Sequence, residues 1–525
     1  MTAPIDRIDR LFAHNARTLP GQTHLVLADG HTPTVLQTWL QTWQRAASVA
    51  AALLASGVKP GDRVLVLAGN SRELPELYVA CGIVNAICVP VNTLTTAREL
   101  AATAQDCSPA AAFVEHSLID RITPELAIPG LKVVIRASEP GWQTYEDVVA
   151  AAPKDTPARW LLDPPVGCRG DDPGVMIYSS GTTGKPKGIL LSHYGVIENA
   201  RMTQSVARIQ MADINLAMLP LFSSFGFCWD FLMPALAGAT TLVLRKFDPQ
   251  AALNAIEKHR VTVLVGVPTM FARIFDAPEL AKADISTLRL MDVGGGPVSD
   301  KLKHDLKHVH GIEIIESYGL TEISPVAAAQ VPGDSHRPGS TGPALPGVEV
   351  KVIDGEGMVL APNEPGELCF RASTLMIGYW NRPEQTAESL QGGWLHSGDI
   401  GIVDEGGHIY IRDRLKDMIV ANGYNVYPKE VENALAEHPA VQNVAVVGVP
   451  DEIRGEVIHA FAVLREGASA TEEALIAHCA TLIGKHKLPR QIHFTDDLPL
   501  TASGKIQRFA LRARARDAIA AKASA

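Results

Sequence analysis

The sequence predicts an α/β protein with a large N-terminal domain, made of layered α/β sheets plus a small β-barrel-like subdomain, and a small α+β C-terminal domain. Short apolar, β-branched runs alternate with helical patterns over the N-terminal part, which is typical of layers built on largely parallel sheets. After Pro343 this alternation gives way to closely spaced strands, and after Lys416 helices and strands mix again. We therefore expect a domain boundary near residues 412–416.

The elements of the N-terminal part are predicted from apolar runs bounded by turn-forming residues. The segment 36–58 carries a helical pattern that ends near Gly57. Buried strands are predicted from β-branched apolar runs at 62–70, 86–92, 261–268 and 288–295. The repeated alternation of such strands with helical segments is the basis for the parallel sheets.

The part after Pro343 contains shorter units. Tight turns such as DEGG join predicted strands at 348–354, 366–372 and 407–413. A helix is predicted over 426–439, with Pro428 near its first turn, a position that Pro favours. Strands are predicted at 443–449 and 458–464, and the Ala/Arg-rich C-terminus is expected to form an exposed helix.

Composition excludes several classes of function. The sequence has 47 Lys and Arg against 57 Asp and Glu, for a net charge of −10, which argues against general nucleic-acid binding. The N-terminus lacks the order of a secretory signal, and no apolar run approaches the ~18 residues of a transmembrane segment. Seven Cys with no CxxC pair predict reduced, mostly buried thiols and a cytoplasmic protein.

The stretch IYSSGTTGKPKGILLSH, residues 177–193, is the most informative segment. Strand-like runs flank its centre at 175–178 and 188–192. A Walker loop needs GxxxxGK[ST] and then a helix, whereas here Pro186 follows Lys185 and no helix starts, so a P-loop kinase or ATPase is excluded. Its glycines, hydroxyl groups and lysines still suit phosphates. A polar surface turn would have the same composition, so the loop alone does not decide.

Further motifs accompany this loop: MDVGGGPVS at 291–299, ESYGLTE at 316–322, GGWLHSGDIG at 392–401, DRLKDMIVANGYNVYPKEVE at 413–432 and LPLTASGKIQR at 498–508. Each alone has an ordinary structural explanation as a turn or a packing site. In this order, SSGTTGKPKG, YGLTE, SGD and GK, the chain resembles the superfamily of adenylate-forming enzymes. That superfamily includes acyl-CoA synthetases, adenylation domains of peptide synthetases and luciferases. The resemblance covers nearly the whole chain, from about residue 10 to 510.

The resemblance implies a two-step reaction that uses ATP, Mg²⁺ and CoA. A carboxylate attacks the α-phosphate of ATP to give acyl-AMP and pyrophosphate, and the thiol of CoA then displaces AMP. Because the first step brings two anions together, cations must offset their repulsion. The implied domains are an AMP-binding (adenylation) domain at 1–412, a hinge at 413–416 and a mobile domain with the catalytic lysine at 417–525.

Single residues are carried over only where the motifs match. The resemblance implies that Lys505, Glu322 and Thr183 are catalytic, and that Glu322 binds Mg²⁺ together with Ser179. Glu316 stands where the family often has Asn or Gln, and its carboxylate can only accept a hydrogen bond from the adenine amino group. The implied nucleotide-binding residues are Ser179, Ser180, Gly181, Thr182, Thr183, Gly184, Lys187, Gly295, Gly296, Pro297, Glu316, Ser317, Tyr318, Gly319, Thr321, Asp399, Ile411, Arg414 and Lys505.

The same resemblance implies that the C-terminal domain rotates between the two steps. Lys416 falls at the hinge position of the family, and Gly423 and Tyr424 belong to the face that would receive CoA. The chain departs from the usual motif at Asp413, where Gly is common. That substitution leaves the turn geometry before Arg414 open.

The acid-binding pocket is implied to include Phe225, Phe227, Val267, Gly294 and Tyr318. Ser223 stands where the family often has His. A peptide synthetase domain would usually have Asp at this position to hold the substrate ammonium, so Ser223 argues against an amino-acid substrate. The nearby Asp230 weakens this argument. No Arg or Lys occurs in 219–244, so a second substrate carboxylate would lack a partner. We therefore expect an apolar acid, either a medium- or long-chain fatty acid or an aromatic acid. Ordinary core packing is the competing explanation for the aromatic residues.

The sequence therefore predicts an acyl-CoA synthetase, that is, an AMP-forming carboxylate–CoA ligase. One alternative is an acyl-AMP ligase that loads a carrier protein, although the insertion common in such ligases is not found. Another is a non-catalytic nucleotide-binding homologue. The expected partners are a small-molecule carboxylic acid and CoA, with no nucleic acid, and a homodimer is compatible with the sequence.

Overall fold

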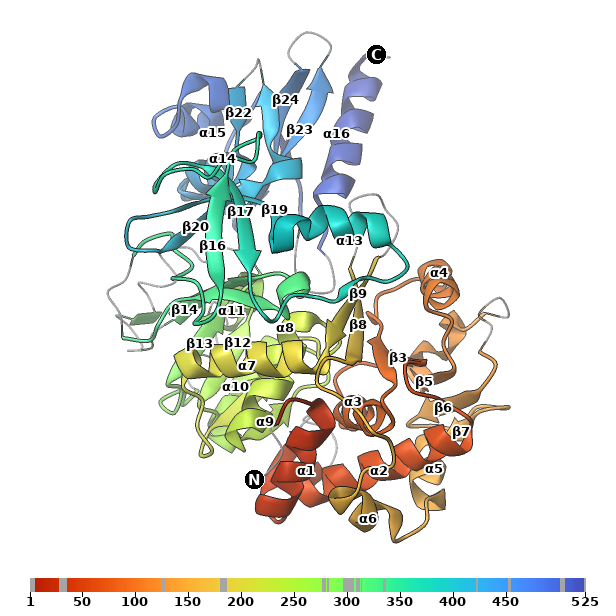
Figure 1. Cartoon of the computed structure of the whole chain (residues 1–525). Coiled ribbons are helices and arrows are strands. Elements are labelled where there is room, and N and C mark those ends of the chain that lie inside the picture. Colours follow the sequence, from red (N-terminus) through yellow and green to blue (C-terminus); the bar gives the residue numbers. More distant parts are fainter. Residues whose placement is uncertain are drawn as a thin grey trace. The chain divides into compact units, whose positions relative to one another are not determined.

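The computed structural model describes residues 5–27, 35–123, 126, 128–179, 187–275, 280, 283–295, 306–307, 312, 314–333, 337–421, 424–451, 455–500 and 506–523. The chain forms two compact units, and Figure 1 labels many of their helices and strands. The first unit comprises Met1–Glu349 and Phe370–Leu395, and the second comprises Val350–Cys369 and His396–Ala525. The mixed α/β fold with a large N-terminal and a small C-terminal part is confirmed. The hinge at 413–416 concerns motion and stays a prediction.

One sheet of the first unit has eight strands in the order β18-β9-β8-β4-β3-β5-β6-β7. Its strands are β3 (Arg63–Leu67), β4 (Ile87–Pro90), β5 (Ala111–Glu115), β6 (Leu131–Ile135), β7 (Gln143–Thr144), β8 (Pro173–Ser179), β9 (Lys187–Ser192) and β18 (Gly378–Tyr379). The strands from β8 to β7 pair in parallel, whereas β9 pairs antiparallel with both β8 and β18. The strands predicted at 62–70 and 86–92 are thus confirmed.

The other sheet of the first unit also has eight strands, in the order β15-β14-β13-β12-β10-β11-β1-β2. Its strands are β1 (Thr23–Leu27), β2 (Val35–Thr38), β10 (Ile214–Ala217), β11 (Thr240–Val243), β12 (Val263–Gly266), β13 (Leu290–Val293), β14 (Ile314–Gly319) and β15 (Val326–Ala329). Only the edge strands β2 and β15 pair antiparallel. Because β12, β13 and β14 are parallel neighbours, their carboxyl ends meet at one edge of the sheet.

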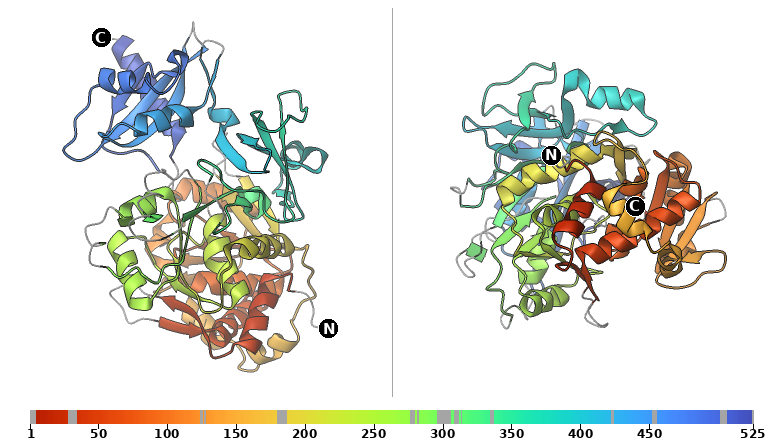
Figure 2. Two further views of the ribbon diagram at one scale, coloured as in Figure 1. Left: turned by 90° about the vertical axis from the view of Figure 1, so that its left-hand side faces the viewer. Right: turned by 60° about the horizontal axis from the view of Figure 1, so that its bottom comes forward.

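Helices cover these sheets. The α-helices of the first unit are α1 (Ile8–Thr18), α2 (Trp39–Ala55), α3 (Glu73–Val84), α4 (Ala97–Cys107), α5 (Tyr145–Ala151), α6 (Thr156–Leu162), α7 (His193–Ala207), α8 (Ser224–Gly226), α9 (Met233–Ala237), α10 (Pro249–His259), α11 (Pro268–Phe275) and α13 (Pro383–Ser389). Thr38 and Gln41 form a capping box at the start of α2, which stabilises its first turn. The helix predicted over 36–58 is thus present, but it begins at Trp39, because residues 36–38 belong to β2. The helices α1, α2 and α3 pack against one another (Figure 2).

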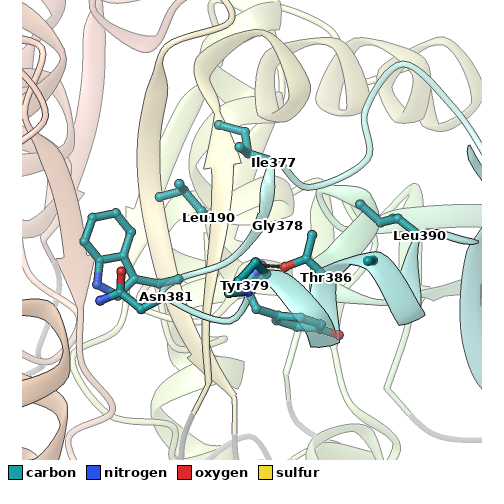
Figure 3. A pocket seen from close by; sticks show the side chains of 10 residues that line it. Leu190, Ile377, Gly378, Tyr379, Asn381, Thr386 and Leu390 are labelled. Carbon is teal, nitrogen blue, oxygen red and sulfur yellow. Dashed lines mark hydrogen bonds between the residues drawn. The ribbon is translucent and has the colours of Figure 1, made fainter.

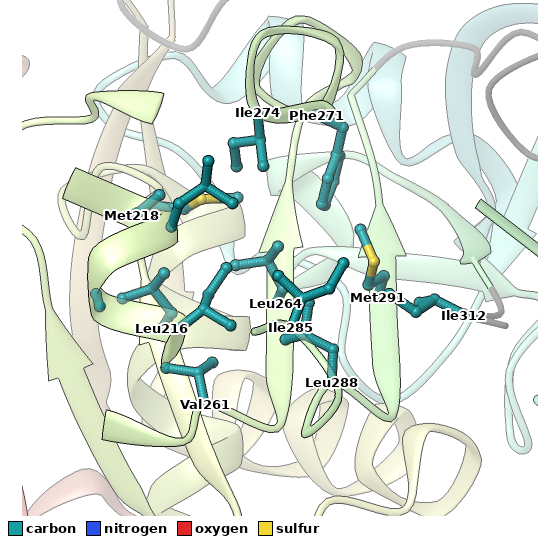
Figure 4. Packing of buried hydrophobic residues seen from close by; sticks show 14 of the residues in the cluster. Leu216, Met218, Val261, Leu264, Phe271, Ile274, Ile285, Leu288, Met291 and Ile312 are labelled. Atoms are coloured by element: carbon teal, nitrogen blue, oxygen red, sulfur yellow. The ribbon is translucent and has the colours of Figure 1, made fainter. Parts of the chain in front are cut away.

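A hydrophobic core lies between the second sheet and the helices α10 and α11. Leu216, Leu264 and Met291, from three neighbouring strands, pack in one buried cluster with Phe271 and Ile274 of α11 (Figure 4). Apolar burial of this kind stabilises the folded chain by about 25 cal/mol per Å². The cluster therefore gives the ends of β12 and β13 a rigid base.

The second unit holds most of a four-stranded sheet, β16-β17-β19-β20, and a five-stranded sheet in which β22-β21-β24-β23 is extended by β25 beside β24. The strands are β16 (Glu349–Ile353), β17 (Gly366–Arg371), β19 (Leu395–Val403), β20 (Ile409–Arg414), β21 (Ile419–Ala421), β22 (Tyr424–Val426), β23 (Val441–Asp451), β24 (Gly455–Leu464) and β25 (Gln491–Phe494). The helices are α14 (Pro428–Ala436), α15 (Glu472–Cys479) and α16 (Arg508–Ala523). The strands and helices predicted after Pro343 are thus present.

The terminal helix α16 is only partly as expected. It is helical, but the prediction that it is exposed is wrong for one face, because Leu511 and Ala515 are buried beside Val447 and Phe461. These two positions are four apart and so lie on the same side of a helix. In addition, Arg508 forms an ion pair with Glu432. A mixed sequence rich in Ala and Arg conceals this short apolar stripe.

Two expectations about the chain as a whole can be checked. All seven cysteines are free and six of them are buried, which confirms the expected reduced, mostly buried thiols. Across the parts of the chain that the structure covers, no helix has both the length and the apolar character that crossing a membrane requires.

Candidate active site

The Gly/Ser/Thr loop connects two antiparallel strands. Ser179, the last residue of β8, pairs with Lys187, the first residue of β9. The loop between them therefore closes a hairpin and does not lead into a helix, which agrees with the exclusion of a Walker loop. Some predicted phosphate-binding residues lie outside the described residues, namely Ser180, Gly181, Thr182, Thr183 and Gly184.

A tyrosine that the sequence did not suggest links the base of this hairpin to Glu322. The phenol of Tyr379 donates a hydrogen bond to Oε1 of Glu322 at 3.0 Å. On the other side, Nζ of Lys187 lies 5.1 Å from the centre of the Tyr379 ring, within the range of a cation–π contact. Burial and the neighbouring Glu322 carboxylate raise the pKa of Tyr379. The phenol therefore stays protonated and remains a donor at neutral pH.

Glu322 is held by its backbone as well. It lies in a short 3-10 helix (η4, Thr321–Ile323) between β14 and β15. The fully buried side chain of Asn199, on α7, donates to the carbonyls of Ile323 and Val326 at 3.0 and 2.8 Å. The same side chain accepts from the Val326 amide at 3.0 Å. A buried amide with three such bonds fixes the position of η4, because leaving them unmade would be costly.

The carboxyl ends of β12, β13 and β14 bring together several predicted nucleotide-binding segments. Gly266, Val293 and Glu316 are in register across the three strands. The Gly294 amide donates to the Gly266 carbonyl at 3.1 Å, which extends the pairing beyond β13. Gly295 has a positive φ of 76°, a conformation that favours glycine. Gly296 and Pro297 lie outside the described residues.

The predicted residues of β14 differ in how they are held. The hydroxyl of Ser317 donates to Oδ2 of Asp292 at 2.8 Å, and burial raises the pKa of Asp292 well above its ordinary value. The Glu316 carbonyl accepts from the Gln330 backbone amide at 2.9 Å, and Glu316 is buried. The ring of Tyr318 is tilted against Phe370 at 5.8 Å between centroids. The hydrogen bond from Ser317 to Asp292 therefore ties the end of β14 to β13.

Gly319 closes this strand at a point with no room for a side chain. A methyl group there would lie 1.8 Å from the carbonyl oxygen of Pro325. Next to it, the hydroxyls of Thr321 and Ser224 lie 2.9 Å apart. Thr321 is thus tied to the segment that carries the predicted acid pocket.

That segment supplies Phe225 and Phe227, which have different surroundings. A methyl group on Gly294 would lie 2.6 Å from Cζ of Phe225, so the Phe225 ring covers Gly294 closely. Phe225 is partly exposed, and it lies edge-on to Trp229 at 6.4 Å. Phe227 is buried against Tyr78 at 4.5 Å, as expected of a core residue. Phe225 is therefore better suited than Phe227 to contact a ligand.

Residues 227–232 form a π-helix, η2, a rare element that often occurs at functional sites. Val267, at the end of β12, is also buried. Ser223 closes the turn before η2, donating to the Pro220 carbonyl at 2.7 Å and accepting from the Gly226 amide at 3.2 Å. Its role in the structure is therefore to cap the short helix α8.

Asp230 is fully buried and already paired. Its carboxyl oxygens accept from the Asn215 side chain at 3.0 Å and from the Leu219 amide at 3.2 Å. Burial raises its pKa to about 8. These contacts make Asp230 a core residue. It is therefore a weak candidate for holding the ammonium group of an amino-acid substrate.

A pocket of about 450 Å³ lies beside Tyr379 in the first unit. Figure 3 shows its lining, in which the Tyr379 amide donates to the hydroxyl of Thr386 at 2.9 Å. Leu190, Ile377 and Leu390 give it an apolar wall. The tyrosine that holds Glu322 is thus anchored to α13 through its backbone.

In the second unit, Asp399 and Arg414 lie opposite each other on β19 and β20. Nε of Arg414 lies 2.9 Å from Oδ1 of Asp399, whose side chain is almost fully buried, whereas that of Arg414 is 46% exposed. Ile411 is paired with Gly401 on the same two strands. These two predicted nucleotide-binding residues are therefore already paired within one sheet.

Asp413 resolves the turn geometry that the sequence left open. Its carboxylate accepts from the Arg414 amide at 2.8 Å and from the Lys429 amide at 2.9 Å. The second contact satisfies an amide in the first turn of α14, a helix whose preceding residue, Tyr427, provides no side-chain cap. Asp413 thus fastens the end of β20 to the start of α14.

The remaining predicted residues are described in part or not at all. The backbone of Lys416 lies in a short 3-10 helix, η6 (Leu415–Asp417), and Tyr424 begins β22. Gly423, Lys505 and the Tyr424 side chain lie outside the described residues.

Sequence reasoning missed Tyr379, Asn199 and Ser224. Each acts through a contact with a residue far away in the chain, 57, 124 and 97 positions from its partner. No spacing or composition rule signals such contacts, because they depend on the tertiary fold.

Known proteins resemble the chain over nearly its full length. A family model described as AMP-binding enzyme matches residues 12–380, and one described as AMP-binding enzyme C-terminal domain matches 430–505. The fatty acid–[acyl-carrier-protein] ligase ScoC of Streptomyces coeruleorubidus is 36% identical over 503 residues, which is 94% of this chain and 93% of that protein. A feruloyl-CoA synthase of Amycolatopsis sp is 36% identical over 492 residues, 92% of this chain and 95% of that protein.

Solved structures agree. The anthranilate CoA ligase AuaEII, in complex with anthranoyl-AMP, superposes with a TM-score of 0.88 at 29% sequence identity and covers 98% of both chains. Family models, relatives and structure thus point the same way, and the motifs on the hairpin and on β14 lie within the region that the first family model matches. The chain is a member of the AMP-binding enzyme family.

Proposed function

We propose that this chain is an AMP-forming carboxylate–CoA ligase that activates an apolar acid. In the first step a carboxylate oxygen forms a bond to the α-phosphorus of ATP, and the bond to the β-phosphate breaks to release pyrophosphate. In the second step the sulfur of CoA bonds to the acyl carbon, AMP leaves, and the thiol proton passes to solvent. The observation that carries the proposal is the link from Lys187 through Tyr379 to Glu322 in a chain of this family.

The residues of the first unit would handle the phosphates and the base. Lys187 and the loop before it would offset the charge of the β- and γ-phosphates. Tyr318 and the Gly294–Gly295 backbone would contact the adenine, and Glu316 would accept from its amino group. Support for this assignment comes from the shared edge at which β12, β13 and β14 end, the usual ligand position of parallel sheets.

Glu322 fits the role of a magnesium ligand. Mg²⁺ takes oxygen donors and is usually held by one or two carboxylates plus substrate phosphates. Glu322 is partly exposed, and Tyr379 and the backbone orient it. When bound there, Mg²⁺ would neutralise phosphate charge as pyrophosphate leaves. Ser179, partly exposed at the start of the loop, would supply a hydroxyl oxygen.

The second unit would supply the ribose contacts and the mobile lysine. Asp399 would accept from the ribose hydroxyls and Arg414 would donate to them, which the preformed pair supports. Lys505 would reach the carboxylate and the α-phosphate in the first step and withdraw for the second. The hinge at Lys416 and the CoA-binding residues Gly423 and Tyr424 complete this assignment.

An apolar acid is the expected substrate. Phe225 and Gly294 would form part of the pocket wall, and the internal pairing of Asp230 removes a candidate partner for a substrate ammonium. The relatives include a fatty acid ligase and a feruloyl-CoA synthase, which supports both a fatty and an aromatic acid. The seven free thiols support a cytoplasmic location.

A carrier protein is the alternative acceptor, because one relative is named as an acyl-carrier-protein ligase. CoA and a carrier protein share the pantetheine arm but differ in what that arm is attached to. Incubation of the protein with ATP, acid and either CoA or a phosphopantetheinyl carrier separates them. Thioester formed on CoA supports the proposal, and thioester formed only on the carrier contradicts it.

The decisive test is a panel of acids assayed by pyrophosphate release with CoA present.

Lys505→Ala should abolish acyl-AMP formation but largely spare thioester formation from supplied acyl-AMP. Lys485→Ala is the matched control, because it removes an exposed lysine of the same unit. Equal loss of both half-reactions in Lys505→Ala would show that the role of this lysine is wrong.

A further inference from the structure

Three potential metal ligands converge between two strands of the second unit. Glu367 and Cys369 are two residues apart on β17, so their side chains lie on the same face of the sheet. His396 lies on the neighbouring strand β19. Its Nδ1 atom is 3.7 Å from Sγ of Cys369 and 3.1 Å from Oε2 of Glu367. All three donor atoms lie within 4.8 Å of one another.

Hydrogen bonding alone does not satisfy this cluster. Both the thiol of Cys369 and the carboxylate of Glu367 contact the same ring nitrogen. If Nδ1 of His396 carries a proton, it can donate to the carboxylate but cannot accept from the thiol. If it carries no proton, it can accept from the thiol but turns a lone pair toward the carboxylate. A cation among the three atoms would satisfy all of them together.

Two of the three donor separations are close to those of a tetrahedral zinc site. Zinc bonds of about 2.3 Å to sulfur and about 2.0 to 2.2 Å to nitrogen and oxygen imply sulfur–nitrogen and nitrogen–oxygen separations of about 3.6 and 3.4 Å. The corresponding separations here are 3.7 Å and 3.1 Å. Only small side-chain adjustments would therefore be needed to admit the ion.

The donor set also selects the type of metal. A sulfur, a nitrogen and an oxygen donor suit zinc, whereas magnesium and calcium prefer oxygen alone. The side chains of His396 and Glu367 are 25% and 17% exposed, whereas Cys369 is buried. Burial and the Glu367 carboxylate raise the pKa of Cys369 to about 12, so the thiol is protonated when no metal is bound.

We propose that Glu367, Cys369 and His396 bind a zinc ion that cross-links β17 to the start of β19. As the zinc–sulfur bond forms, the thiol proton passes to solvent, and a water molecule fills the fourth position. This site is separate from the nucleotide contacts, and its existence does not depend on the proposed reaction. A zinc ion bound there would, however, affect the turn that precedes Asp399.

That turn is bonded to the zinc ligands. Oε1 of Glu367 accepts from the Gly398 amide at 2.9 Å, and the Ser397 hydroxyl donates to the Leu368 carbonyl at 2.6 Å. The same hydroxyl accepts from the Asp399 amide at 3.0 Å. A metal bridging Glu367 and His396 would therefore restrain both sides of this turn. Zinc binding should stabilise the second unit against unfolding.

The test uses the whole 525-residue chain, stripped of metal with a chelator and titrated with Zn²⁺ by calorimetry. We expect one zinc per chain and a midpoint of thermal unfolding that rises by several degrees in excess zinc. Co²⁺ should give the thiolate-to-cobalt absorption band. Cys369→Ser should remove the band, and both Cys369→Ser and His396→Gln should weaken zinc binding at least tenfold.

Cys168→Ser is the matched control, because Cys168 is the one cysteine that is not buried and so the strongest competitor for surface-bound metal. It should bind zinc like the unaltered chain. Loss of the cobalt band in Cys168→Ser but not in Cys369→Ser would overturn the proposal. So would unchanged zinc affinity in His396→Gln, a variant that keeps every cysteine and serves if Cys369→Ser folds poorly.

Discussion

The phenol of Tyr379 donates a hydrogen bond to Oε1 of Glu322 across 57 positions of the sequence, at 3.0 Å. The contact joins β18, beside the phosphate-loop hairpin, to the short helix η4 after β14. The carboxylate that we assign to Mg²⁺ is therefore oriented from the strand next to the hairpin that would hold the phosphates. This arrangement makes Tyr379 a positioning residue whose contribution can be measured.

Tyr379→Phe should slow acyl-AMP formation about tenfold, because a hydrogen bond to a charged group contributes about 1.5 to 3 kcal/mol. The ring that faces Lys187 is retained, so the cation–π contact persists. The Mg²⁺ concentration needed for half-maximal rate should also rise, because Glu322 loses its fixed orientation. Both effects are measured by pyrophosphate release during a Mg²⁺ titration.

The matched control for this variant is Tyr410→Phe. Tyr410 also bonds a carboxylate through its phenol, that of Asp404 at 3.1 Å, but on the sheet of the second unit. The Tyr410→Phe variant should leave the Mg²⁺ dependence of acyl-AMP formation unchanged. A Tyr379→Phe enzyme with an unaltered Mg²⁺ requirement would mean that the phenol does not position a metal ligand.

Gly294→Ala should narrow the acid pocket. The added methyl would lie 2.6 Å from Cζ of Phe225, a contact too short to exist without movement of the ring. We expect kcat/KM for bulky aromatic acids to fall by about tenfold or more, with a smaller loss for short acids, since about one methylene is worth 1 to 3 kcal/mol in a pocket. A series of acids of increasing size measures this change.

A double variant tests whether Phe225 is the cause. In Gly294→Ala combined with Phe225→Ala, the clash is removed and activity with bulky acids should recover toward that of Phe225→Ala alone. Strictly additive losses in the two variants would show that the ring and the glycine do not act through each other.

Much of this architecture follows from local sequence. The strands β3, β4, β12 and β13 were predictable, because each is a short buried run of β-branched and aliphatic residues bounded by turns. The motif around Glu322 could also be identified, because its residues are contiguous. Tyr379 could not, since nothing in a single tyrosine tells which carboxylate it will meet after folding.

The same limit explains two differences in the second unit. Asp413 replaces a common Gly, and only the fold reveals that its carboxylate serves the Lys429 amide at the start of α14. The helix α16 seemed exposed because its composition is rich in Ala and Arg. Two positions, Leu511 and Ala515, suffice to attach it to β23 and β24, and so short a stripe is below what periodicity can reveal.

Asp230 predicts a pH dependence of stability. Its pKa is about 8 in the folded chain, because the carboxyl is fully buried, against 3.8 for an exposed Asp. Between these values folding takes up a proton, so this group's contribution is fully present below about pH 4 and is lost as the pH rises through about 8. The loss is at most about 1.4 kcal/mol per pH unit.

Asp230→Asn removes this titration. Relative to the unaltered chain, the variant should gain about 1 to 3 kcal/mol of stability between about pH 6 and about pH 8, followed by thermal unfolding. Asp284→Asn is the control, because Asp284 is exposed and its pKa, lowered to about 2 by hydrogen bonds with Ser286 and by Arg260, leaves it charged throughout this range. Parallel pH profiles for the unaltered chain and Asp230→Asn would refute the assignment.

Lys416→Pro tests the hinge. Lys416 lies in the single turn η6, directly after the β20 strand that carries Arg414. Proline fixes φ and also restricts the residue before it, so rotation of the backbone at this point should be blocked. We expect the second half-reaction, from supplied acyl-AMP and CoA to thioester, to slow by at least tenfold, while acyl-AMP formation falls much less. The control is Glu405→Pro, at the second position of the turn between β19 and β20, where proline is tolerated. If Lys416→Pro left the overall rate undiminished, the two steps would not need rotation at this residue, and the boundary of the mobile domain would have to be sought elsewhere.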